Sequence, residues 1–265
     1  MMVAGSRRSH APPRLLAVLA VLGGLFVALP LAALVVRAPW RDAWSTLTGE
    51  TALTALRLSL QVSLLAAFFS VILGAPLGWI LARANFPGRS LLRAVAILPL
   101  VLPPVVAGIG LLAAFGRSGL MGRLLYETGV QVTFTTAASV IAATFVSMPL
   151  VVLAVETGLR SIDERYEDAA ATLGARPGFR MLHVTAPLLR PQLVAGAVLA
   201  WARALGEFGA TITFAGNLQG RTQTLPLAVF EARQTDAGAA IVMSVLLVVV
   251  SVGVLIAMRD RLLAR

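Results

Sequence analysis

The 265-residue sequence contains no cysteine and no lysine, and it has only two histidines, His10 and His183. Without cysteine, the chain has no disulfides, no thiolate metal ligands and no cysteine nucleophile. A P-loop needs the lysine of G-x-x-x-x-G-K-[ST], so ATP hydrolysis through that motif is excluded. The histidines lie too far apart for a zinc motif, and neither G-x-S-x-G nor H-E-x-x-H occurs. We therefore expect a chain that is not an enzyme and that binds no metal or cofactor itself.

Charged residues are also scarce. They make up 13% of the chain, against 58% hydrophobic residues, and the mean hydropathy is +0.87. A soluble domain is typically about 25% charged. All 22 basic residues are arginine and the net charge is +10, a balance that could indicate nucleic-acid binding. However, the arginines are spaced between apolar runs, which is typical of a membrane protein. The predicted partner is therefore membrane lipid, and no nucleic acid.

Six apolar segments are long enough to cross a bilayer, which takes about 20 helical residues for about 30 Å of hydrocarbon. The sequence predicts an all-α membrane protein with one transmembrane domain over residues 1–265. An arginine pair before the first run resembles a signal peptide, but the run is longer than a usual signal sequence, so we expect an uncleaved span. The predicted spans are 15–36, 52–81, 91–115, 132–155, 193–214 and 239–258.

The third predicted span contains Pro99, Pro103 and Pro104. Proline removes a backbone donor, and membrane helices tolerate this where neighbours satisfy the freed carbonyls. We therefore expect a kinked or broken helix, with Pro103 and Pro104 inside the bundle near a pathway.

The distribution of arginine predicts the orientation. With the N-terminus inside the cell, fourteen arginines fall on the inner side and six on the outer side, while Arg57 and Arg203 lie within spans. The positive-inside rule then puts both termini, and the loop at 160–190, in the cytoplasm of a multi-pass cell-membrane protein.

The loop at 160–190 is unusually polar for this chain. Ser161 and Glu164 have the spacing of a capping box, which predicts a helix from Ile162. Gly174 is typical of a helix end, and we expect a second short helix that Pro177 starts and Pro187 stops. One face of the first helix should be apolar; it comprises Ile162, Tyr166, Ala169, Ala170 and Leu173. From residue types alone, an amphipathic connector on the membrane surface is an open alternative.

The spacing in this loop resembles a family signature. Asp168-Ala169-Ala170, three residues, Gly174, nine residues, Val184, one residue and Ala186-Pro187 are similar to the E-A-A-x3-G-x9-I-x-L-P pattern of binding-protein-dependent ABC importer permeases. Aspartate replaces glutamate, valine replaces isoleucine, and alanine replaces leucine. The resemblance implies that the loop docks on a separate ATPase subunit, which uses the ATP and Mg and moves the permease helices by its closure. The implied coupling residues are Glu167, Asp168, Ala169, Ala170, Gly174, Val184 and Pro187.

Two other segments resemble one branch of that family. "ILPLVLPPVVAGIGLL" (97–112) is similar to the third span of molybdate and sulfate permeases, and residues 203–230 most resemble the molybdate permeases. The resemblance implies a permease for molybdate or tungstate that acts with a second copy as a homodimer, two ATPase subunits and an extracytoplasmic binding protein. A sulfate or thiosulfate permease is the alternative within the family. An ion-gradient secondary transporter is the alternative from another class, but it would not explain the loop.

Polar residues in and after the fifth predicted span are candidates for an anion pathway. Arg203 and Glu207 are four residues apart, so they can form a local ion pair or contact an anion. Thr211, Thr213 and Asn217 could donate neutral hydrogen bonds to an anion. Threonine hydroxyls in spans also commonly bond back to helical carbonyls, and that alternative stays open.

Overall fold

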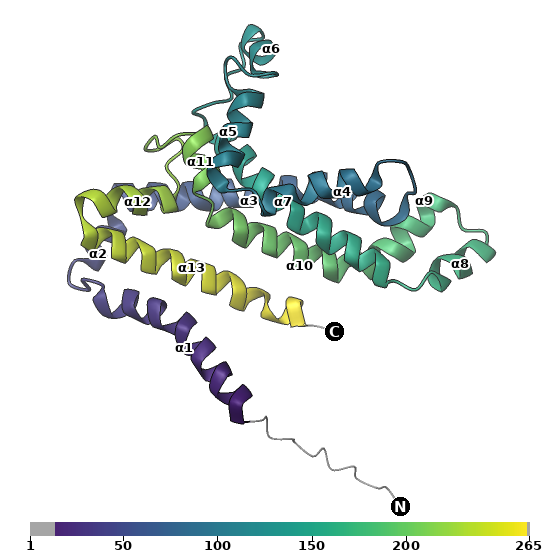
Figure 1. Ribbon diagram of the computed structural model, residues 1–265, viewed down its shortest axis with the longest axis horizontal. Helices are drawn as coiled ribbons and strands as arrows, with labels where there is room; N and C mark the ends of the chain where they lie inside the picture. Colours follow the sequence, from purple (N-terminus) through teal and green to yellow (C-terminus); the bar gives the residue numbers. More distant parts are fainter. Residues whose placement is uncertain (1–13, 264–265) are drawn as a thin grey trace, which may run out of the picture.

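The computed structural model describes residues 14–263, which are helical and contain no β-strand. The central layer consists of α3 (Glu50–Arg83), α7 (Thr136–Ser161) and α10 (Ala186–Leu205), which pack side by side (Figure 1). The pair α3 and α7 makes the most extensive helix contact in this part of the chain. These three helices hold most of the buried side chains, so they form the frame that positions everything else.

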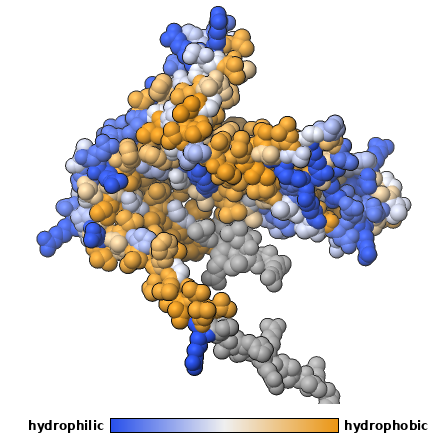
Figure 2. All heavy atoms as spheres, in the orientation of Figure 1, coloured by the Kyte–Doolittle hydropathy of each residue, from blue (hydrophilic) through white to orange (hydrophobic). Residues whose placement is uncertain are grey.

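Two further long helices flank this layer. The last helix, α13 (Ala237–Leu263), packs beside α10, and α1 (Arg14–Arg37) lies beyond α13 with no buried side chain. Figure 2 shows apolar side chains over the middle of the molecule and hydrophilic ones at the end that carries the polar loop. That distribution suits a multi-pass membrane protein. Three of the arginines that predict the orientation, at positions 7, 8 and 265, lie outside the described residues.

Within residues 14–263, five helical runs are long and apolar enough to cross a membrane, and a sixth crossing is counted if one bent pair forms a span. The bent pair is α4 (Arg89–Ile97), extended by the 3-10 turn η1 (Leu98–Leu100), and α5 (Pro104–Phe115), which meet at 116°. The structure therefore breaks the predicted 91–115 range at the proline cluster. Proline at 104 starts α5, where its missing N–H costs no helical hydrogen bond.

The predicted fifth span, 193–214, is wrong as one helix. Helix α10 begins earlier, at Ala186, and ends at Leu205, and a separate α11 (Gly209–Phe214) follows. The fourth predicted range, 132–155, is shifted too. Helix α7 starts only at Thr136, because the Thr135 hydroxyl caps it by accepting a hydrogen bond from Ala138 N.

The remaining elements are short and join the long helices. Three lie at the end opposite the polar loop or project from the layer, and three form that loop. They are α2 (Ala43–Thr48), α6 (Gly122–Glu127), α12 (Leu225–Thr235), α8 (Arg165–Thr172), α9 (Pro177–Arg180) and the π-helical turn η2 (Met181–Thr185).

Small residues allow the close packing of α3 against α7. A Cβ on Gly78 would lie 2.7 Å from the carbonyl oxygen of Val152 and 2.9 Å from the Cβ of Val155. Nearby, the buried hydroxyls of Ser70 and Ser147 are 2.9 Å apart and hydrogen-bond across the interface. Membrane helices associate through such close backbone approach and interhelical hydrogen bonds, because hydrocarbon offers no hydrophobic driving force between them.

Replacing Gly78 by alanine should therefore force α3 and α7 apart. We expect a loss of about 1–3 kcal/mol, the usual cost of overpacking a tight interface. Thermal unfolding of the detergent-purified protein measures the effect. Gly253→Ala is the matched control because no atom lies within 4 Å of the added methyl group, and equal unfolding midpoints for the two variants would contradict the close contact.

Candidate functional site

The polar loop has the predicted order of helix, glycine and short helix. It lies at one end of the bundle, where α8 and α9 follow α7 (Figure 1). Gly174 has a φ of +82°, in the left-handed region that favours glycine, and two residues after α8 it turns the chain. Pro177 is the first residue of α9. The loop is thus a folded unit and not an irregular connector.

The predicted start of the first helix is wrong. Ser161 is the last residue of α7, and its hydroxyl donates to Gly158 O at 2.7 Å, so it does not cap a following helix. Helix α8 begins at Arg165, whose N–H donates to Asp163 Oδ1 at 3.0 Å. The capping spacing was misleading because α7 continues six residues beyond the predicted span end at Val155.

Pro187 does not stop the second short helix as predicted. The chain is helical without a break from Pro177 to Leu205, through α9, η2 and α10. Within this run the N–H of Ala186 donates to Met181 O, a π-type bond, and Pro187 is the second residue of α10. Inside such a run a proline lacks the N–H of one helical hydrogen bond, and the run continues past Pro187 with a local change of helix type just before it.

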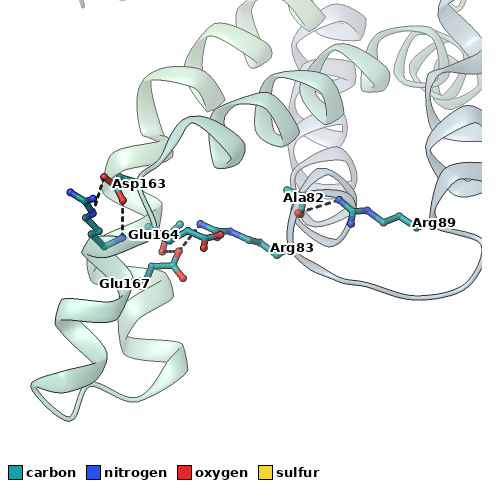
Figure 3. Close-up of polar contacts among 8 residues, drawn as sticks. Ala82, Arg83, Arg89, Asp163, Glu164 and Glu167 are labelled. Carbon is teal, nitrogen blue, oxygen red and sulfur yellow. Dashed lines mark hydrogen bonds and ion pairs between the residues drawn. The ribbon is translucent and has the colours of Figure 1, made fainter.

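Arg83, at the end of α3, holds the loop against the bundle. Its Nη1 donates to Glu164 Oε1 at 3.1 Å and its Nη2 to Glu167 Oε1 at 3.0 Å (Figure 3). The Thr185 hydroxyl donates to the same Glu167 oxygen at 2.8 Å. Glu167 therefore ties α8 to both α3 and η2, and its carboxylate is turned toward its own chain. We call Arg83, Glu164, Glu167 and Thr185 the loop clasp.

The other face of the loop carries exposed residues. Asp168 and Ala169 are exposed, and α8 buries no side chain. Tyr166 and Leu173 are 58% and 88% exposed, so this part of the predicted apolar face does not pack on this chain, whereas Ile162 packs against the core cluster that contains Val155. Beside it lies a shallow depression of about 430 Å³ lined by Ala170, Leu173, Gly174, Ala175, Arg176 and Phe179. Small side chains around an apolar depression allow a partner's backbone to come close.

A buried carboxylate near the loop was missed from the sequence. Glu156 on α7 is 4% exposed, and its Oε1 accepts hydrogen bonds from Arg160 Nη2 at 2.8 Å and forms an ion pair with Arg93. The predicted span ended at Val155, one residue short of it. The signal that could have found it is the spacing of Glu156 and Arg160, four residues apart at the end of an apolar run.

The two broken helices pack on each other away from the loop. A Cβ on Gly209 of α11 would meet Pro104 Cβ of α5 at 2.5 Å. A Cβ on Gly108 would meet Thr213 Cβ at 2.6 Å. Pro103 immediately precedes α5, and both it and Pro104 are exposed on this chain, so their predicted place inside the bundle is wrong. The proline cluster and the segment after Glu207 are thus brought together, as a shared site would require.

The polar candidates in this region are bonded within the chain. Glu207 is 3% exposed; its Oε2 pairs with Arg203 Nη1 at 2.7 Å and its Oε1 accepts from Ala210 N at 2.8 Å. The Thr213 hydroxyl donates to Gly209 O, and Asn217 Nδ2 donates to Glu231 Oε2. Thr211 is buried. These are the bonds expected if the polar residues only stabilise the fold and do not contact an anion. Arg203, whose side chain is 35% exposed, keeps further guanidinium donors.

Among residues 14–263, no group of three or more histidine, aspartate or glutamate residues is arranged to hold a metal ion. The buried carboxylates Glu156 and Glu207 are each bonded to arginine. What the arrangement offers is a folded, exposed loop at one end and a broken pair of helices elsewhere in the bundle.

Removing the Glu167 carboxylate should loosen the loop. In Glu167→Ala, α8 loses its bonds to both Arg83 and Thr185, so we expect backbone amides of residues 165–172 to exchange with deuterium about tenfold faster or more. Hydrogen–deuterium exchange mass spectrometry measures this. Glu164→Ala is the control, since Glu164 also bonds Arg83 but is 80% exposed and does not contact Thr185. An equal effect in both variants would mean that Glu167 has no special part.

Comparison with known sequences places these features in a family. The model of the family described as "Binding-protein-dependent transport system inner membrane component" matches residues 74–265. The molybdenum transport system permease protein ModB of Mycobacterium tuberculosis is 49% identical over 245 residues, covering 91% of this chain and 93% of that protein. Escherichia coli ModB is 46% identical over 185 residues, covering 69% and 81%. The sulfate transport system permease protein CysT of Salmonella typhimurium is 38% identical over 209 residues, covering 78% and 76%.

Solved structures share the fold. A bacterial ABC transporter that imports the acidic polysaccharide alginate superposes with a TM-score of 0.74 at 18% identity, covering 93% of this chain and 94% of that chain. The inward-facing MetNI methionine ABC transporter gives 0.65 at 20% identity, covering 81% and 95%. The family match over most of the chain, the relatives at 46–49% identity and the shared fold make this multi-pass membrane protein a member of the binding-protein-dependent transport system inner membrane components.

Proposed function

We propose that this chain is the permease subunit of an ATP-driven importer for molybdate, with tungstate as a second substrate of the same class. The observation that carries the substrate is the 46–49% identity to ModB proteins, against 38% to a sulfate permease. The segment after Glu207, "FGATITFAGN", supports the same choice. Import of sulfate or thiosulfate is the second candidate, and the sulfate permease relative is the observation that favours it.

ATP is hydrolysed, in this proposal, by separate ATPase subunits that use Mg and dock on the loop at 160–190. The exposed depression between α8 and α9 is the docking surface, with Ala169, Ala170 and Gly174 admitting the partner's backbone. Asp168 points outward and offers an acidic contact. The loop clasp and the uninterrupted run into α10 support the proposal, since a firmly attached loop passes a push to the helices and a floppy one dissipates it.

The remaining partners follow from the same family. We propose a homodimer with two ATPase subunits, an external binding protein that delivers the anion, and both termini in the cytoplasm. An open apolar groove of about 660 Å³ between α3, α5 and α7 supports a contact with the second copy. The positive-inside count supports the orientation. The loop that precedes α12 lies at the opposite end from the polar loop at 160–190, which suits delivery of the anion from outside the cell (Figure 1).

The anion pathway is proposed to pass the broken helices α5 and α11. Arg203 is the cation in this region, and its pairing with Glu207 lowers its attraction for a dianion. A compensated arginine suits a conduit that has to release its cargo. Thr211 lies nearby on α11, whereas Thr213 and Asn217 already donate within the chain.

The substrate is tested by uptake of labelled molybdate in cells with and without this chain, each with and without excess unlabelled sulfate. Uptake that requires the chain and resists sulfate supports molybdate. If sulfate abolishes uptake, the chain is a sulfate-type permease that carries molybdate incidentally.

Docking is tested at Ala170, which lines the depression. Ala170→Arg should reduce molybdate uptake at least tenfold and prevent copurification of the ATPase, because a long charged side chain would block close approach. Ala171→Arg is the matched control, as Ala171 is exposed on the same helix but does not line the depression. Uptake and ATPase copurification that survive in Ala170→Arg would refute docking at this site.

A further inference from the structure

A basic pocket lies between the start of α4 and the end of α7. It has a volume of about 400 Å³, is open to the surface, and is lined by Phe86, Gly88, Arg89, Ser90, Arg93 and Arg160. We call it the arginine pocket. None of its lining residues belongs to the loop clasp or to the depression on α8 and α9. It therefore needs an explanation of its own.

The pocket carries more positive than negative charge. Within residues 14–263, its arginines form ion pairs only with Glu156, a buried carboxylate whose oxygen Oε1 is shared by Arg93 and Arg160. Arg89 donates hydrogen bonds from Nε to Leu81 O and from Nη2 to Ala82 O, at the end of α3. Three positive charges against one leave a net charge of +2, so the pocket attracts an anion.

Hydrogen-bond donors remain in this pocket. A guanidinium carries five N–H donors, and Arg89 and Arg160 each use at most two of its three nitrogens in bonds within residues 14–263. Arg93 Nε is buried and has no hydrogen-bond partner in the same part of the chain. Planar arginine forks match the oxygens of a phosphate group, so the chemistry that would satisfy these donors is a tetrahedral oxyanion.

On the opposite side from Arg89 and Arg93, α4 and the first residue of η1 present an apolar face. Leu91, Val95 and Leu98 follow one another at helical spacing and are 68%, 55% and 48% exposed. Arg89 and Arg93 are also one turn apart, on a different face of the same helix. The exposed apolar residues put this helix in contact with hydrocarbon, so an anion in the pocket can come from the headgroup of a neighbouring lipid. Basic pockets between membrane helices bind anionic lipid headgroups in this way.

We propose that the arginine pocket binds a phosphate-type oxyanion, presented by the headgroup of an anionic lipid or taken up as the free ion. The bound anion bridges α4 and α7 beside the point where α3 attaches to the polar loop at 160–190. The site is independent of substrate passage and adds a lipid-sensing contact to the proposed importer.

Native mass spectrometry of the purified permease, with its ATPase where the two copurify, tests this. In wild-type protein we expect phosphatidylglycerol to be retained and phosphatidylcholine not. Arg89→Gln combined with Arg160→Gln should reduce retention about tenfold or more, since each basic residue contributes to anionic lipid affinity. Arg93 is kept so that Glu156 stays paired. Arg160→Gln alone, which leaves the α3 carbonyl bonds intact, should reduce retention several-fold and decides the question if the double variant does not fold.

The control pair is Arg165→Gln with Arg190→Gln, which removes the same charge from exposed positions outside the pocket. It should keep phosphatidylglycerol. A second arm adds millimolar inorganic phosphate: displacement of the lipid identifies the free ion as a ligand too, and no displacement identifies the headgroup as the source. Equal lipid retention in wild type and Arg160→Gln, or equal losses in pocket and control variants, would overturn the proposal.

Discussion

The close approach of α3 to α7 sets the geometry on which the charged end of the molecule depends. A methyl group on Gly78 would clash with α7 and one on Gly74 would be tight against it, so the close approach of the two helices in this register depends on glycine. A slip of one residue would rotate each side chain by about 100°. Arg83 would then miss Glu164 and Glu167, and Glu156 would turn away from Arg93 while keeping Arg160 on its own helix. Small residues at the middle of the frame thus determine which charges meet at its end.

The absence of lysine fits the way in which these charges are used. Arg83 reaches two carboxylates and Arg89 reaches two backbone carbonyls, each through separate nitrogens of one planar group. A lysine ammonium is a compact point charge on a flexible stem and does not impose such a fork geometry. At the edge of an apolar bundle an unpaired polar group is costly. One arginine there satisfies the hydrogen-bonding needs of several groups at once.

The sequence predicts that the long helices exist, because an apolar run long enough to cross a membrane indicates a transmembrane helix by itself. It also predicts the break at the proline cluster and the folded loop, since Pro104, Gly174 and Pro177 act through backbone constraints that are local. The ends of the helices were less predictable. Hydropathy placed the end of α7 at Val155, whereas the buried ion pairs of Glu156 extend it to Ser161.

Tertiary contacts account for the other differences. Helix α10 ends at Leu205, and the Glu207 side chain just after it accepts a hydrogen bond from Ala210 N. The spacing of apolar residues in the sequence does not predict this break. Likewise, Glu167 stood in the sequence beside Asp168 as one acidic pair. Only the folded chain separates them, turning Glu167 to Arg83 and Thr185 and leaving Asp168 exposed.

The uninterrupted helical run from Pro177 to Leu205 has a mechanical consequence. At a rise of about 1.5 Å per residue, its 29 residues form a rod of about 40 Å. Tilting such a rod by about 5° around one end displaces the other end by about 3 to 4 Å, more than the length of a hydrogen bond. Arg203 lies two residues before the far end. A rotation of a few degrees at the loop is therefore large enough to open or close contacts at the break between α10 and α11.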